Sequence, residues 1–99
     1  MKTLQETIKQ FFNVNLPISG GDGQSVDTPI IIHSTENPVP MEYKIIGFIQ
    51  ELGNKTWRME KQELINLDGK NIDKVSIVLY GDTDNYRNYY FDITQFQNI

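Results

Sequence analysis

The sequence contains no cysteine, which excludes disulfides, thiolate nucleophiles and sulfur-ligated metals. It also lacks alanine, so its apolar residues are mostly large. Purely apolar runs such as Ile30–Ile32 fall far short of the roughly 20 residues that a membrane span requires. No apolar stretch follows Lys2 as it would in a secretory signal, so we expect a cytoplasmic protein.

The charges are scattered, with no block of either sign. Thirteen acidic and nine basic side chains give a net charge of −4. Nucleic-acid binding depends on clustered Lys and Arg, and so does binding to an anionic membrane, so we expect neither partner. A basic protein partner is compatible with this charge because opposite potentials speed encounter. Mild acidity can equally serve only to keep a small domain soluble.

Two helices are indicated, and the length suits one domain over residues 1–99. Thr3 and Glu6 have the spacing of a capping box, which begins the first helix. The second is expected over residues 41–52, where Gly47 is interpreted as permitting close packing. Each helix has one apolar stripe that we expect to face the core. The stripes are Leu4, Ile8, Phe11 and Phe12 in the first helix, and Ile45, Phe48, Ile49 and Leu52 in the second.

Residues 57–67 are ambiguous between helix and strand. Their central Glu60–Leu64 stretch has good helix propensity, yet Asp68-Gly69 is a strong signal for a two-residue hairpin turn. The strand predicted over residues 75–80 also needs an antiparallel neighbour. We therefore predict a strand. A bulge is expected within it, because the unbulged register sets the apolar residues of the next strand against polar ones.

The remaining segments complete an α-β-α-β-β-β order. Ser19–Ser25 is predicted as a glycine-rich loop, Pro29–His33 as a short strand, residues 81–85 as a loop and Asn88–Thr94 as the last strand. The first strand, the second helix and the next strand form a crossover, and the last three strands a meander. The predicted fold class is α+β: one mainly antiparallel sheet of about four strands, with both helices on one face.

Several of these features occur together in a familiar pattern. A Ser-Gly-Gly-x-Gly loop precedes the isoleucine-rich strand, and Glu42-Tyr43 opens a helix. The rest of the pattern is Trp57, Gln62, Leu64, Asp68-Gly69-Lys70, Asp73 and Tyr90-Phe91-Asp92-Ile93. Over residues 17–96 the chain resembles a group of small uncharacterised bacterial α+β proteins, some of them immunity partners of toxins. The resemblance implies a bacterial origin and this fold, and carries over no active residue.

Three segments are candidates for chemical sites. The Gly20–Gly23 loop resembles a phosphate cradle but is followed by Gln24 where a Walker loop has its lysine, and Asp22 would repel an anion, which favours a flexible connection. Asp82, Asp84 and Asn85 gather oxygen ligands without EF-hand spacing, which favours a plain acidic turn. The single histidine, His33, has no nucleophile or acid at a recognisable spacing. We therefore expect no metal, no cofactor and no catalysis.

Aromatic side chains are concentrated in the predicted hairpin region. They are Trp57, Tyr80, Tyr86, Tyr89 and Tyr90. Such residues are enriched at binding hot spots, although they also serve as ordinary cross-strand pairs. The leading hypothesis is a non-catalytic protein-binding domain, an immunity or regulatory protein that acts through this aromatic-rich sheet face. The alternative is a small-ligand-binding or enzymatic domain with a pocket near the Gly20–Gly23 loop and His33.

Overall fold

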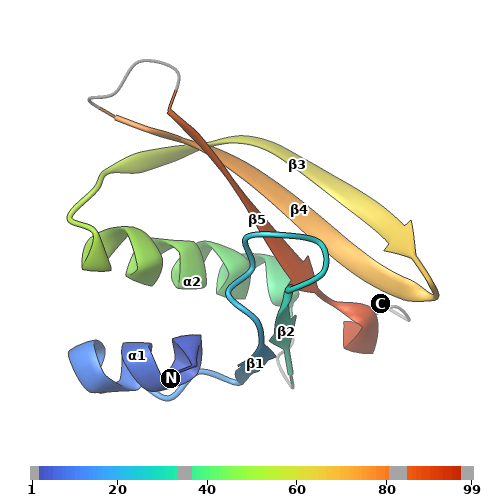
Figure 1. Cartoon of the computed structure of the whole chain (residues 1–99), viewed down its shortest axis with the longest axis horizontal. Helices are drawn as coiled ribbons and strands as arrows, with labels where there is room; N and C mark the ends of the chain where they lie inside the picture. Colours follow the sequence, from blue (N-terminus) through green and yellow to red (C-terminus); the bar gives the residue numbers. More distant parts are fainter. Residues whose placement is uncertain (1–2, 34–36, 81–84, 97–99) are drawn as a thin grey trace.

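The computed structural model describes residues 3–33, 37–80 and 85–96. Its elements are α1 (Leu4–Phe12), β1 (Ile18–Gly20), β2 (Ile30–Ile32), α2 (Pro38–Leu52), β3 (Trp57–Leu67), β4 (Lys70–Leu79), β5 (Tyr86–Asp92) and a 3-10 turn, η1 (Thr94–Phe96). The strands form one sheet in the order β1-β2-β5-β4-β3 (Figure 1). The α+β class is confirmed, but the sheet has five strands and is mixed, because β2 pairs parallel with β5.

The capping box predicted for α1 is present. Thr3 Oγ1 accepts the Glu6 N–H at 3.1 Å, and Glu6 Oε1 accepts the Thr3 N–H at the same distance. Ile8 is fully buried, but the stripe is narrower than predicted because Phe11 is 64% exposed. On a nine-residue helix that packs along one edge of the sheet, the Phe11 position turns away from the core.

The second helix begins three residues earlier than predicted. Asn37 caps it by accepting the Val39 N–H, and Pro38 occupies the first turn, where its missing N–H costs nothing. The prediction that Gly47 permits close packing was wrong, because a side chain added there would meet nothing within 4 Å. No helix among the described residues is long and apolar enough to cross a membrane.

The hairpin between β3 and β4 is confirmed, and so is its bulge. Asp68 and Gly69 both have positive φ, 52° and 79°, as a type I′ turn requires. The register follows the two-residue turn as far as Lys61 opposite Ser76. It then shifts between Met59 and Lys61, which places Met59 opposite Ile77 instead of Val78. The bulge thereby keeps apolar side chains of both strands on one face.

The strand β1 was missed, because its Ser19 and Gly20 were interpreted as loop. It pairs antiparallel with β2, with Ile18 opposite Ile32. The last strand also differs from its predicted range of 88–94, beginning at Tyr86 and ending at Asp92. The predicted meander of β3, β4 and β5 is confirmed, and β2, α2 and β3 form a crossover that spans two intervening strands.

Both helices lie on the same side of the sheet (Figure 1). One core joins Ile8 of α1 and Ile45 of α2 to the helix-facing side chains of the strands. Those side chains are Ile30 and Ile32 of β2, Val75, Ile77 and Leu79 of β4, and Tyr89 and Phe91 of β5. Because strand side chains alternate between faces, the residues between them point the other way. We call that opposite side the outer face.

Candidate functional site

The structure divides the five predicted partner-binding aromatics between the two sides of the sheet. Tyr89 is 5% exposed and faces the helices, where its hydroxyl accepts a hydrogen bond from Gln50 Nε2 at 2.7 Å. Burial raises the pKa of this phenol. Trp57 also packs against the core. Tyr89 therefore belongs to the interior, and Trp57 is a half-buried residue at the margin of the core.

The other three aromatics belong to the open side. Tyr86 and Tyr90 alternate with the buried Tyr89 along β5 and so point to the outer face. Tyr86 is 53% exposed, and Tyr80, just after the end of β4, is 54% exposed. Among the described residues, no helix covers the outer face (Figure 1). Of the predicted set, Tyr80, Tyr86 and Tyr90 therefore remain as candidates for contact with a partner.

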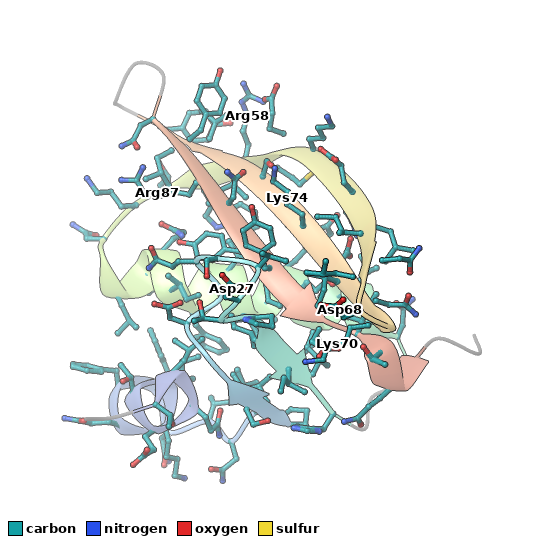
Figure 2. All side chains as sticks on the ribbon, turned by 45° about the vertical axis from the view of Figure 1, so that its right-hand side comes forward. Asp27, Arg58, Asp68, Lys70, Lys74 and Arg87 are labelled. Carbon is teal, nitrogen blue, oxygen red and sulfur yellow. The ribbon has the colours of Figure 1, made fainter. Side chains whose placement is uncertain are left out.

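One end of the outer face is covered by the chain itself. The connection between β1 and β2 approaches the β3–β4 turn, where Val26 and Pro29 line a cavity of about 160 Å³ together with Leu67 and Ile72. Asp27 of this connection and the turn residue Asp68, both labelled in Figure 2, line the same cavity. Ile72 is accordingly only 1% exposed although it points to the outer face. The opposite end, toward Tyr86, is the open half.

Charged and polar side chains surround the tyrosines on the open half. The ammonium group of Lys74 lies 6.0 Å from the centroid of the Tyr90 ring, within the range of a cation–π contact. Ser76 Oγ donates to Asn88 Oδ1 at 2.7 Å across β4 and β5. Arg58, labelled with Lys74 in Figure 2, also belongs to this face because it stands opposite Val78. The surface is thus aromatic and amphipathic, with fixed cross-strand contacts.

His33 belongs to a hydrogen-bonded chain that the sequence did not reveal. Its Nε2 lies 2.6 Å from Ser19 Oγ, and its Nδ1 lies 2.8 Å from Gln95 Nε2. Which ring nitrogen donates in these two contacts depends on the tautomer of His33. The arrangement fastens η1 to β1 and β2.

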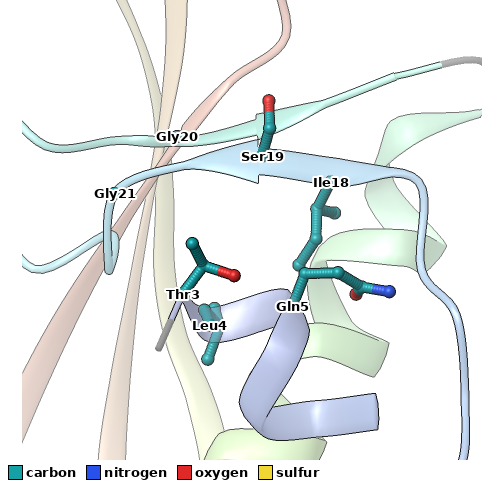
Figure 3. Close-up of a pocket in the computed structure, with 7 residues that line it drawn as sticks. All are labelled: Thr3, Leu4, Gln5, Ile18, Ser19, Gly20 and Gly21. Atoms are coloured by element: carbon teal, nitrogen blue, oxygen red, sulfur yellow. The ribbon is translucent and has the colours of Figure 1, made fainter. Parts of the chain in front are cut away.

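A second cavity lies between the start of α1 and β1. It measures about 190 Å³ and is lined by Thr3, Leu4, Gln5 and the segment Ile18–Gly21. In Figure 3 the Ser19 hydroxyl points away from the α1 residues that line this cavity. The hydrogen-bonded His33 therefore lies on the other side of β1. The glycine-loop pocket and the histidine of the alternative hypothesis do not form one site.

The glycine loop uses its backbone donors internally. The Gly21 N–H donates to Pro29 O at 2.9 Å, and the Gly23 N–H to Thr28 O at 2.8 Å. A side chain at Gly21 would meet Thr28 O at 2.6 Å, so glycine is required by this close approach. A phosphate cradle needs free N–H groups, and these two are occupied. The loop holds β1, β2 and β5 together, since Gly23 O also accepts the Tyr90 N–H.

The most unusual polar feature is a buried carboxyl pair that sequence reasoning missed. Glu42 of α2 is fully buried and Asp73 of β4 is 4% exposed. Gln62 Nε2 donates to Asp73 Oδ2 at 2.5 Å and to Glu42 Oε1 at 3.5 Å. The Tyr43 hydroxyl donates to Gln62 Oε1 at 3.2 Å, which orients the amide. Two carboxyl groups thus share one amide donor beneath the sheet.

A proton on Glu42 accounts for this pair. Burial, together with the hydrogen bond to Asp73 and its negative charge, raises the pKa of Glu42 to about 10. Its Oε2 atom is buried without a hydrogen-bond partner, and burial next to Asp73 favours the neutral carboxyl group. The apolar periodicity of the sequence could have indicated that both residues are buried. Glu42 stands three residues before Ile45 in the buried stripe, and Asp73 alternates with Val75. Both side chains lie beneath the sheet and away from its outer face.

Metal binding finds no support in the part of the chain that the structure describes. There, no three His, Asp or Glu side chains are grouped so that they could hold a metal ion. Asp82 and Asp84 of the acidic turn considered for calcium lie outside the described residues, and Asn85 is the first described residue after them. Compared with protein-family models, with curated proteins and with solved structures, the chain has no significant match in any of the three.

Proposed function

We propose that this protein is a non-catalytic binding domain that contacts another protein through the open half of its outer sheet face. The observation that carries the proposal is the exposure of Tyr80 and Tyr86, each more than half accessible on a side of the sheet that no helix covers. Tyrosine buries a large apolar area on binding and keeps a hydroxyl for hydrogen bonding. A rigid sheet presents such side chains at little cost in conformational entropy.

The contacts around the tyrosines support a preformed surface. Lys74 packs over Tyr90, and the Ser76–Asn88 hydrogen bond joins the two strands beneath. The charges on this face are of both signs, since Arg58 pairs with Glu60 at 2.8 Å and Lys61 with Glu63 at 2.9 Å. The local charge therefore does not favour the basic partner that the net charge allows. A partner with aromatic and polar groups suits this face better.

An immunity or regulatory role is the form of binding that we favour. Such proteins act by occupying a surface of their target and need no catalytic group of their own. This agrees with the burial of Glu42 and Asp73, which keeps this carboxyl pair away from the surface.

The proposal is tested by affinity capture of partners from the native host with tagged wild-type and variant proteins. Tyr86→Ala and Tyr80→Ala should each lower partner recovery about tenfold or more, as truncation of a hot-spot residue does. Phe11→Ala is the matched control, because Phe11 is an equally exposed aromatic on α1. Recovery that is unchanged by both tyrosine variants, or lowered only by the Phe11 variant, contradicts the proposal.

A small-ligand domain remains the second candidate, and the cavity between α1 and β1 is the observation that favours it. Its volume of about 190 Å³ suits only a small, largely apolar molecule. A thermal-shift screen separates the two functions, because a ligand that binds the folded state raises the melting temperature with concentration. Stabilisation that is lost in a Leu4→Trp variant, which fills the cavity, would support this candidate.

A further inference from the structure

The strand β3 forms one edge of the sheet and is its longest strand, with 11 residues from Trp57 to Leu67 (Figure 1). An edge strand keeps alternate backbone N–H and C=O groups unpaired, so a long, exposed one is a template for another strand. Proteins interrupt such edges with proline, bulges or charged side chains. β3 has its bulge at Glu60 and contains no proline, and its residues 61–67 pair regularly with β4.

The turn determines which backbone groups of β3 point outward. In a two-residue hairpin the residues that flank the turn, here Leu67 and Lys70, exchange backbone hydrogen bonds. Every second residue of β3 therefore directs its backbone N–H and C=O groups to β4. The residues in between direct theirs away from the sheet. On the regular part of β3 these are Gln62, Leu64 and Asn66. An added antiparallel strand must bond to these positions.

We propose that this edge pairs antiparallel with the same edge of a second copy, with Gln62 on the twofold axis. Lys61 and Glu63 flank Gln62, point to the outer face and form an ion pair of 2.9 Å within one chain. Around the axis, Lys61 of each copy stands opposite Glu63 of the other. The four charges alternate in sign, so the edge is self-complementary where a protected edge would repel itself.

Apolar side chains on the helix-facing side fit the same pairing. Leu64 is 60% exposed and Met59 is 42% exposed, which is unusual for large apolar residues on one strand. Both point to the side of the sheet that carries the helices, because they stand opposite Asp73 and Ile77 of β4. The bulge at Glu60 adds one residue, so Leu64 of each copy reaches Met59 of the other. The pairing thus covers the exposed Leu64 and Met59 side chains of both copies. It joins two five-stranded sheets edge to edge.

A charge-exchange experiment tests this pairing by sedimentation equilibrium. The wild-type chain should approach twice its 11.5 kDa mass as its concentration rises. Glu63→Lys surrounds the axis with lysines and Lys61→Glu surrounds it with carboxylates, so each variant alone should associate about tenfold or more weakly. An equimolar mixture should regain the association, since every contact then joins opposite charges. This recovery also shows that both variants are folded.

Two controls separate the edge from other surfaces. Glu51→Lys makes the same charge change on the exposed side of α2 and should leave the association unchanged. Tyr86→Ala, on the open half of the outer face, should also leave it unchanged, so failure of the binding proposal is distinguishable from failure of this one. A wild-type chain that stays monomeric up to about 1 mM overturns the inference. So does an association that survives both charge variants, or a mixture that does not regain it.

Discussion

Glu42 on α2 and Asp73 on β4 form a buried carboxyl pair, with Gln62 Nε2 2.5 Å from Asp73 Oδ2 and 3.5 Å from Glu42 Oε1. Two negative charges this close, away from water, would repel each other strongly. One proton relieves the repulsion. The pair then holds the helix layer to the sheet only while Glu42 keeps that proton.

The first prediction concerns the pH dependence of stability. The pKa of Glu42 is raised from 4.5 to about 10 in the folded protein, so between these values the folded state holds a proton that the unfolded state releases. Stability from this group is complete below about pH 4.5 and is lost as the pH rises toward 10. The loss is at most about 1.4 kcal/mol per pH unit. Urea denaturation at pH 6, 7 and 8 measures it.

Glu42→Gln isolates that effect, because the amide keeps a donor toward Asp73 and does not titrate. The variant should lose less stability than wild type from pH 6 to pH 8 and should be the more stable protein at pH 8. Glu51→Gln, an exposed position on the same helix, is the matched control and should follow the wild-type curve. If wild type and Glu42→Gln change in parallel with pH, Glu42 is ionised in the folded state.

A second prediction contrasts two positions of α1. Ile8 is fully buried in the core, so Ile8→Ala should lower the free energy of unfolding by about 2–5 kcal/mol. Phe11 is 64% exposed, and Phe11→Ala should stay within about 0.5 kcal/mol of wild type. Chemical denaturation midpoints measure both. Equal losses at the two positions would mean that α1 packs through a different face.

The third prediction uses one substitution with opposite signs at two glycines. Gly69 has a φ of 79° in the hairpin turn, and a side chain there meets nothing within 4 Å. Gly69→Ala should therefore destabilise the protein by about 1 kcal/mol through backbone strain alone. Gly47 also has free space but lies in α2, so Gly47→Ala should stabilise by about 0.5–1 kcal/mol. Melting curves that shift in the same direction for both variants contradict the turn geometry or the helix.

Local signals in the sequence were sufficient for much of this fold. The capping box of Thr3 and Glu6 and the Asp68-Gly69 turn depend on neighbouring residues, and both were predicted correctly. The bulge in β3 was predictable because the apolar residues of β3 and those of β4 had to lie on the same face of the sheet. The short strand β1 was not. Three residues that contain Ser19 and Gly20 carry no alternation, and they form a strand only because β2 lies beside them.

The candidate site was less predictable, because it depends on which side of the sheet each residue faces. Tyr89 and Tyr90 are adjacent and chemically alike, yet one is buried beneath the helices and the other lies beside Lys74. Phe11 fitted the apolar stripe of α1 but lies beyond the reach of the core. Ser19, His33 and Gln95 are brought together only by the sheet and η1, which no local spacing encodes.

The most direct test of the binding account is site-specific photocrosslinking in the organism that naturally expresses the protein. A benzophenone amino acid replaces Tyr86 on the open half of the outer face or, as the control, Phe11 on α1, the two positions being similarly exposed. The account predicts a discrete covalent adduct with a second protein from position 86 and none from position 11. The absence of an adduct at position 86, or adducts from position 11 alone, would contradict it.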